Sequence, residues 1–310
     1  MAVPATLFCL RRLRPVLLAY ALLVAVLPPA EARRAPRHRA PRLRMAVAPS
    51  EAIETRVGDE VAAAILILDE LDADNAFESP YLVSAFYYHD GFLHGYPDSR
   101  PDANPARRII ARLGRELTPE RKAQYVALLH RIWAGAARER GAPAFVAPVR
   151  SKEPRGRRRT HRYAIDLFAP QGSPVSSASP GIVLLAECGW TRGDPFSTSS
   201  QSGGNSVIVF DPETDRFYRY CHLATVAVSP GDIVEAGRTL GTVGNTGVNA
   251  SRQGHGRHLH FEVNRYDGQV VRPFTNMELR AMLKSKTGEP ALASTRPARK
   301  PARRARGAGS

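Results

Sequence analysis

The sequence is poor in cysteine and tryptophan and has no long apolar run. Its 310 residues include only 3 cysteines, too few for the disulfide framework of a small secreted domain. The longest apolar run, Val16–Leu27, has 12 residues, whereas a helix needs about 20 to cross a bilayer. Hydrophobic residues still make up 43% of the chain, enough to build a core. A disulfide scaffold, a stable transmembrane helix in the mature chain and a fully disordered chain are therefore excluded.

Acidic residues are also few, 29 against 44 lysines and arginines, which gives a formal net charge of +15. Such a charge suggests a nucleic-acid partner. Half of the basic residues, however, fall in four short segments with a single acid, Glu153; these are residues 11–14, 33–44, 150–162 and 296–306. The rest of the chain has 22 basic and 28 acidic residues, so we expect no specific nucleic-acid binding. Salt-dependent retention of residues 150–285 on DNA would contradict this expectation.

The N-terminus has the features of a secretory signal. Arg11, Arg12 and Arg14 precede the apolar run, and a small-x-small pattern ends at Ala32. A basic segment, a short apolar segment and an Ala-x-Ala-like site are typical of a cleaved signal peptide, which we place at residues 1–32. The alternative is an uncleaved N-terminal anchor. We therefore expect an exported protein, periplasmic or extracellular.

A small helical region is predicted after the signal. Ser50 can cap a helix that extends to about Leu71. Thr118-Pro119 is a second helix start, because a capping hydroxyl is followed by proline at the first helical position. We divide this part of the chain into a disordered basic segment at 33–45, a helical region of unknown role at 46–145 and a basic linker at 146–159.

From residue 160 the pattern changes to short strands. Runs rich in Val, Ile and Tyr alternate with Gly, Pro, Asn and Asp, which is typical of an antiparallel β domain. The predicted strands are Tyr163–Leu167, Gly181–Glu187, Ser206–Phe210, Arg216–Leu223, Thr239–Val243 and Leu259–Val263. Thr191–Asn205 is too long for a hairpin turn and predicts a mobile loop. The domain extends over 160–285, a disordered basic tail follows at 286–310, and the fold class is α+β.

Two histidines lie on one face of a predicted strand. His258 and His260 are two residues apart in an alternating run, so both imidazoles project from the face opposite Leu259, Phe261 and Val263. A lone strand histidine is more often structural than a ligand, but a pair on the polar face of an apolar strand favours a site.

Further candidate ligands come from two other strands. His161 precedes a strand and is followed five residues later by Asp166, and His222 ends a strand on the face shared by Tyr218 and Tyr220. Imidazole nitrogen and carboxylate oxygen suit zinc, and three protein ligands leave a position for water. From spacing alone, a metal site and scattered surface histidines both stay open.

The order of these motifs resembles a known family. His161…Asp166, Tyr220–Leu223 and Gly256–Val263 are similar to the motifs of the lysostaphin/LytM-type zinc metallopeptidases of bacterial cell-wall metabolism. The connecting segments Asp166–Val175, Gly203–Val209, Gly231–Gly237 and Gly244–Gly247 look like the strands and turns of that family. The resemblance covers about residues 160–275 and implies that family's antiparallel sheet, with turns like those of lipoyl domains. A lipoyl carrier itself is excluded, because no lysine lies between Lys152 and Lys284.

The resemblance implies a role for each site residue. His161, Asp166 and His260 would bind one zinc ion per chain, and His222 and His258 would be the catalytic histidines beside it. The commonest family spacing has four residues from the first histidine to the aspartate, and here Arg162 occupies that position. A β-bulge could absorb the extra residue.

The implied function is an exported zinc endopeptidase that hydrolyses peptide bonds in peptidoglycan stem peptides or cross-links, associated with the cell envelope. The alternative is an inactive family member that binds peptidoglycan or activates another cell-wall hydrolase. The oligomeric state and the bond cleaved are not predicted.

Other polar residues near these motifs have simpler structural interpretations. Glu262 shares the face of His260 and could support it, but a solvated strand glutamate is the preferred interpretation. His255 and the pair His89/His94 are interpreted as solvated loop histidines. Cys188 and Cys221 could form a disulfide or stay free.

Overall fold

The computed structural model describes residues 49–88, 104–137, 144–150, 161–196 and 200–285. The predicted signal peptide, the basic segment at 33–45, most of the linker and the C-terminal tail lie outside these residues. Within the described residues, no helix is both long and apolar enough to span a membrane.

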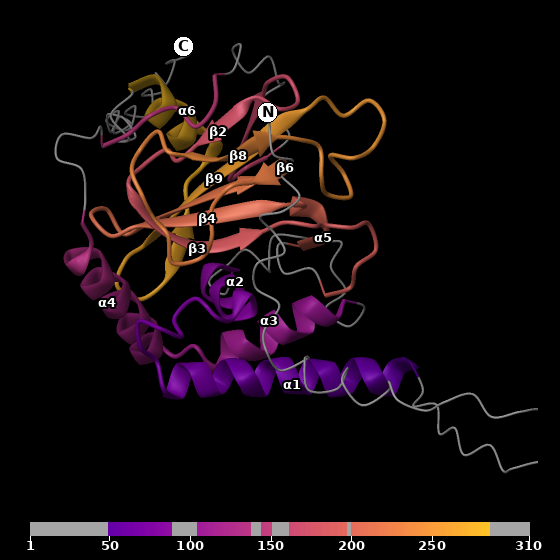
Figure 1. The fold of residues 1–310 in the computed structure, drawn as a ribbon, viewed down its shortest axis with the longest axis vertical. Coiled ribbons are helices and arrows are strands. Elements are labelled where there is room, and N and C mark those ends of the chain that lie inside the picture. The colour runs from indigo at the N-terminus through magenta and orange to yellow at the C-terminus, as the bar shows by residue number, and fades with distance from the viewer. Residues whose placement is uncertain (1–48, 89–103, 138–143, 151–160, 197–199, 286–310) are drawn as a thin grey trace, which may run out of the picture.

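The described chain is arranged in three layers (Figure 1). Four helices form one outer layer, a large sheet forms the middle, and a small sheet with a last helix forms the other side. The helices are α1 Pro49–Asp69, α2 Pro80–Tyr88, α3 Pro105–Glu116, α4 Pro119–Gly135, α5 Ser200–Gly203 and α6 Asn276–Ser285. The strands are β1 Ile165–Phe168, β2 Pro174–Ser176, β3 Gly181–Glu187, β4 Ser206–Asp211, β5 Arg216–Cys221, β6 Leu223–Val226, β7 Ile233–Val234, β8 Thr239–Val243, β9 His258–Tyr266 and β10 Val271–Pro273.

All strand pairs in both sheets are antiparallel. The large sheet has seven strands in the order β1-β9-β5-β4-β3-β7, with β10 also paired to β9. The small sheet has the order β2-β8-β6. Together with the helices, these sheets confirm the predicted α+β class.

Local sequence explains where the helices begin. The Thr118 side chain accepts a hydrogen bond from the Arg121 N–H, and Pro119 follows it, so the predicted start of α4 is confirmed. Asn104 caps α3 in the same way before Pro105. The apolar stripe of α4 is buried at Val126, Leu129 and Trp133. The helices α2, α3 and α6, in contrast to α1 and α4, were not predicted individually from the sequence.

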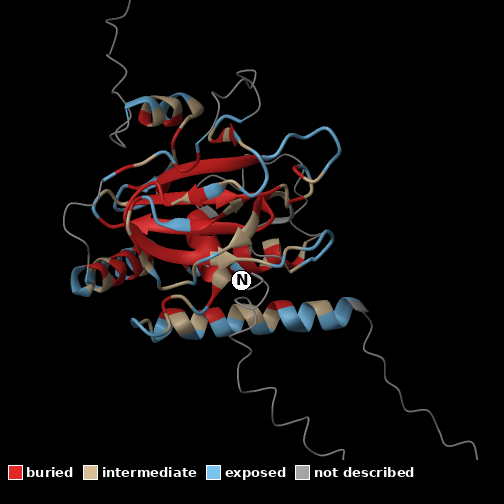
Figure 2. Cartoon of the chain, turned by 45° about the horizontal axis from the view of Figure 1, so that its top comes forward, coloured by how far each residue is buried: buried red, intermediate tan, exposed pale blue. Residues whose placement is uncertain are grey.

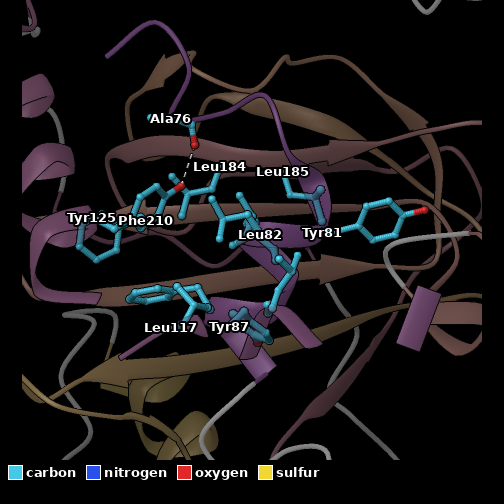
Figure 3. Close-up of a cluster of buried hydrophobic side chains, with 14 of the residues drawn as sticks. Ala76, Tyr81, Leu82, Tyr87, Leu117, Tyr125, Leu184, Leu185 and Phe210 are labelled. Atoms are coloured by element: carbon cyan, nitrogen blue, oxygen red, sulfur yellow. Dashed lines mark hydrogen bonds between the residues drawn. The ribbon is translucent and has the colours of Figure 1, made fainter. Parts of the chain in front are cut away.

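Two apolar cores lie on the two faces of the large sheet. One core fills the space between the large sheet, the small sheet and α6, and includes Leu259, Phe261 and Val263 of β9. The other joins the helices to the opposite face of the sheet (Figure 3), where α2 packs on β3 and β10 and its aromatic rings contact Phe217 of β5. The Tyr125 hydroxyl donates to the Ala76 carbonyl within this second core. α2 and α4 contact the sheet, whereas α1 packs on α2 and α3 as the outermost helix and keeps much of its surface exposed (Figure 2).

Two predicted segments differ from the structure. Arg216–Leu223 was expected as one strand but is divided into β5 and β6, because His222 has a positive φ of 64° and turns the chain. The expected loop Thr191–Asn205 contains the short helix α5. In the same loop, the Phe196 carbonyl accepts a hydrogen bond from the Tyr81 hydroxyl of α2. The Phe196 ring also lies under the Arg56 guanidinium of α1.

Candidate metal and catalytic site

The site lies on the helix-facing side of β9. Alternation along the strand places Leu259 and Phe261 in the core beneath the small sheet, so His258 and His260 face the other way, as predicted. β1 pairs with this part of β9, and Asp166 lies directly opposite His260. Residues opposite one another in an antiparallel pair share a face of the sheet, which brings the carboxylate to the imidazoles.

Three of the predicted side chains converge around Asp166. Its Oδ1 lies 2.9 Å from His260 Nδ1, and its Oδ2 lies 3.4 Å from His161 Nε2. One ligand atom from each of the three residues lies within 4.8 Å of the others. His161 is half-exposed, Asp166 is partly buried and His260 is buried, so the group opens to solvent on the His161 side. Such a geometry leaves access for water and substrate.

The extra residue between His161 and Asp166 is accommodated before the strand begins. The pairing of β1 with β9 has no register shift, so no β-bulge in this ladder absorbs the extra residue. Instead, Arg162 and Tyr163 form a bend. The Asn276 N–H at the start of α6 donates to the Arg162 carbonyl, and the Asn276 side chain donates to the Ala164 carbonyl. The start of α6 therefore holds the bend that brings His161 back to Asp166.

The donor set fits a divalent transition metal. Two imidazole nitrogens and one carboxylate oxygen are the ligand types of catalytic zinc sites. The two carboxylate oxygens already face the two histidines. Although burial alone would raise the pKa of Asp166, its hydrogen bonds to His161 and His260 hold the pKa well below the usual range. The carboxylate is therefore ionised and able to bind a cation.

His222 reaches the site through an unusual backbone conformation. Simple alternation would place His222 on the face of Tyr220, which is buried in the opposite core, so our prediction of a face shared with Tyr218 and Tyr220 is wrong. The positive φ at His222 turns its ring to the other face, 4.9 Å from the His258 ring centroid. Left-handed backbone is rare outside glycine and often marks a functional residue.

The neighbourhood of His222 is built from close backbone contacts. The His222 N–H donates to the Gly203 carbonyl at 2.9 Å, and its Nδ1 lies 2.7 Å from the Thr246 carbonyl. Gly247 has a φ of 101°, and a Cβ there would lie 2.3 Å from the Ser202 carbonyl oxygen. Only glycine fits at this approach, so α5 and the turn at Gly247 together fix the ring.

The hydrogen-bond partners divide the histidines into two kinds. Nδ1 of His222 and Nδ1 of His258 each face a backbone carbonyl, Thr246 and Gly256 respectively, at 2.7 Å. A carbonyl can only accept, so each Nδ1 carries the proton and each Nε2 keeps a free electron pair. His260 instead lies between two carboxylates, with Nδ1 facing Asp166 and Nε2 at 2.9 Å from Glu262 Oε1.

The same division appears in the pKa values. Burial, together with the neighbouring His260 and His258, lowers the pKa of His222 to about 3, and burial also lowers the pKa of His258. Both imidazoles are therefore neutral at pH 7. Burial acts in the same direction on His260, but its hydrogen bonds to Asp166 and Glu262 outweigh it and raise the pKa to about 9.

Glu262 is not a solvated strand glutamate, so our preferred interpretation of it is wrong. Its side chain is 1% exposed. Oε1 contacts His260 Nε2, Oε2 accepts a hydrogen bond from the Tyr87 hydroxyl at 2.7 Å, and Arg219 donates to both oxygens at 3.2 and 3.4 Å. Burial would raise the pKa of Glu262, but the charge of Arg219 and the bond to His260 lower it to about 2. The i, i+2 spacing placed Glu262 on the face of His260, but no sequence signal indicated that Tyr87 of α2 covers it.

The remaining candidates do not join the site. His255 is exposed on a loop, and His89 and His94 lie outside the described residues. Cys221 is a buried free thiol, so it forms no disulfide with Cys188. Burial raises the pKa of Cys221 to about 12, which keeps it protonated.

Comparison with known proteins finds one similar segment in this chain. The model of Peptidase family M23 matches residues 160–273, the segment that holds all five predicted site residues. That segment is therefore similar to this family, and the resemblance to the lysostaphin/LytM type is confirmed for residues 160–273.

Individual relatives match the same part of the chain. Lysostaphin of Staphylococcus simulans is 31% identical over 37% of this chain and 19% of its own length. The peptidoglycan DD-endopeptidase ShyC of Vibrio cholerae is 33% identical over 34% of this chain and 21% of its own. Lipoprotein NlpD of Yersinia enterocolitica is 27% identical over 35% of this chain and 93% of its own. The solved structure of lysostaphin overlaps 51% of this chain and 60% of that chain with 23% identity and a TM-score of 0.34. The chain thus spans about a fifth of the lengths of lysostaphin and ShyC.

Proposed function

We propose that the protein is an exported zinc endopeptidase that cleaves peptide bonds in peptidoglycan stem peptides or cross-links. The observation that carries the proposal is the division of the histidines. His161, Asp166 and His260 form a group that can hold one metal ion, and His222 and His258 stand beside it with neutral imidazoles and free Nε2 atoms. Relatives of the same segment are named as lysostaphin and as a peptidoglycan DD-endopeptidase.

In this proposal His161, Asp166 and His260 would hold a zinc ion, which would polarise a peptide carbonyl and lower the pKa of water toward about 7. The protein supplies the proton transfers. The Nε2 of His258 or His222 accepts the proton of the attacking water, because Nδ1–H of each ring is already held by a backbone carbonyl. The protonated Nε2 can then donate to the leaving amine or stabilise the developing oxyanion.

Export and location at the envelope are part of the proposal. They rest on the signal-like residues 1–32 and on the cationic terminal segments, which suit a polyanionic envelope. The expected signature is a mature chain that begins near residue 33 in the periplasm or the culture medium. Recovery of the uncleaved chain in the cytoplasm would contradict this part of the proposal.

The decisive experiment combines metal analysis with digestion of purified peptidoglycan. We expect about one zinc per chain, release of soluble peptide fragments with new amino termini, and loss of release after chelation. Readdition of zinc should restore it. His161→Ala tests the longer spacing directly, since loss of zinc and activity assigns His161 as a ligand, whereas full retention of both would mean that another group fills the position.

The non-catalytic alternative is a defined outcome of the same experiment. It predicts a protein that binds peptidoglycan, or that stimulates a second cell-wall hydrolase, yet releases no peptide fragments when loaded with zinc. That result would overturn the endopeptidase proposal.

A further inference from the structure

The helical layer touches the candidate metal centre at one point. Glu262, whose Oε1 contacts His260, also accepts a hydrogen bond from the hydroxyl of Tyr87 in α2. Tyr87 lies outside residues 160–273, which match the peptidase family. We propose that Tyr87 is a positioning residue of the metal centre, acting through Glu262 on His260, so that the helical layer is an integral part of the site. This inference rests on the proposed zinc site.

Glu262 determines which nitrogen of His260 is available to a metal. An ionised carboxylate only accepts hydrogen bonds, so its contact at 2.9 Å requires the proton of His260 to be on Nε2. Nδ1, which lies beside the ionised Asp166, carries the second proton of the metal-free ring and is the nitrogen that would exchange that proton for a metal ion. A carboxylate that accepts from the outer nitrogen of a ligand histidine fixes the tautomer and the ring orientation.

Glu262 in turn is held by groups from two different layers. Arg219 reaches it from the neighbouring strand β5, where the two residues lie directly opposite each other. Tyr87 reaches it from α2. Because the Glu262 side chain is 1% exposed, water cannot readily replace a lost partner, and each donor that is removed leaves a buried charge less well compensated.

The position of Tyr87 is itself fixed by packing. Its ring is buried between α2 and the sheet (Figure 3), 6.3 Å from the Phe217 ring centroid in an edge contact and 5.8 Å from the Arg219 guanidinium. A phenylalanine can occupy the same space. The hydroxyl can therefore be removed by Tyr87→Phe without opening a large cavity.

The test compares Tyr87→Phe with Tyr125→Phe in the full mature chain. Tyr125 is a matched control, since it is equally buried in the helix–sheet core and its hydroxyl donates to the Ala76 carbonyl rather than to the site. Zinc affinity is measured by competition with a chromophoric chelator, and thermal unfolding of the zinc-free form measures stability. We expect Tyr87→Phe to weaken zinc binding about tenfold, and Glu262→Gln by about 10–100-fold, as for other partners of metal ligands. Tyr125→Phe should lose stability alone.

Equal zinc affinity in wild type and Tyr87→Phe would overturn the inference while leaving the proposed function intact. Absence of zinc binding in the wild type would overturn both. If Tyr87→Phe does not fold, histidine ¹⁵N spectra of the zinc-loaded wild type decide. A proton on His260 Nε2 that exchanges slowly with solvent supports the inference, and a His260 bound through Nε2 overturns it.

Discussion

The two ends of β9 present the same face of one strand to two different environments. At the first end, His258 and His260 lie beside Asp166, close to the half-exposed His161. At the last end, Tyr266 lies under α2, with its ring centroid 5.9 Å from that of Phe86. Both ends are buried, and Glu262 lies between them in the strand, with contacts to His260 and to Tyr87 of α2. Burial alone therefore does not distinguish the candidate site from the apolar core. The two ends differ in the chemistry of the side chains that cover them.

This difference shows how the helical layer acts on the sheet. Where apolar side chains of α2 cover the strand, the sheet contributes to stability. Where the covering layer ends, polar side chains stay buried only because each has a charged or hydrogen-bonding partner. Glu262 lies at the boundary between the polar and the apolar part of this face. Substitutions on the His260 side should affect metal binding, and substitutions on the Tyr266 side should affect stability.

The largest expected effect is the loss of the metal at the first end of β9. His260→Ala removes a ligand and leaves Asp166 and Glu262 without their shared partner, so zinc content should fall from about one per chain to near zero and peptidoglycan cleavage should be lost. Metal analysis of the purified protein is the measurement.

Tyr266→Leu is the matched control on the same face of the strand. It should lower the free energy of unfolding by about 1–3 kcal/mol and leave zinc content unchanged. The comparison between the two ends fails if Tyr266→Leu loses zinc while it is still folded.

A smaller effect is expected for the two histidines that face backbone carbonyls. His258→Ala should retain zinc and lower turnover by about 10²–10⁴-fold, the range for loss of a general acid or base. At His222 the substitution of choice is asparagine, because it tolerates the left-handed backbone better than alanine does. Steady-state cleavage of a soluble peptide, measured beside zinc content, distinguishes this result from ligand loss. Loss of zinc in either variant would move that residue into the ligand set.

Local sequence patterns were sufficient to predict the features that depend only on neighbouring residues. His258 and His260 follow the alternation of a regular strand, and Thr118-Pro119 is a local cap, so both were predicted from neighbouring residues alone. The five candidate residues were proposed from spacing and the family resemblance, and their side chains lie together in the structure. The bend at Arg162 was not predicted, because it depends on hydrogen bonds from Asn276, more than 100 residues away.

The features that sequence analysis missed depend on backbone exceptions or on distant contacts. The orientation of His222 follows from a single positive φ that strand alternation cannot indicate. The burial of Glu262 follows from a helix whose Tyr87 lies 175 residues earlier in the chain, outside the segment that the family model matches. A glutamate in an alternating strand is solvated unless something covers it, and periodicity carries no information about the cover.

The smallest effect is expected where the helices meet the sheet far from Glu262. His130 of α4 pairs with Asp215 in the β4–β5 turn, with Nε2 2.9 Å from Oδ1, and both side chains are 42% exposed. Exposed pairs of this kind contribute less than about 1 kcal/mol, because water and salt screen the interaction. His130→Ala should therefore lower stability by no more than that and leave zinc affinity and turnover at wild-type values, as measured by thermal unfolding and chelator competition. A drop in zinc affinity comparable to that of Tyr87→Phe would show that any loosening of the helical layer reaches the metal centre, and that Glu262 is not the point through which the two are coupled.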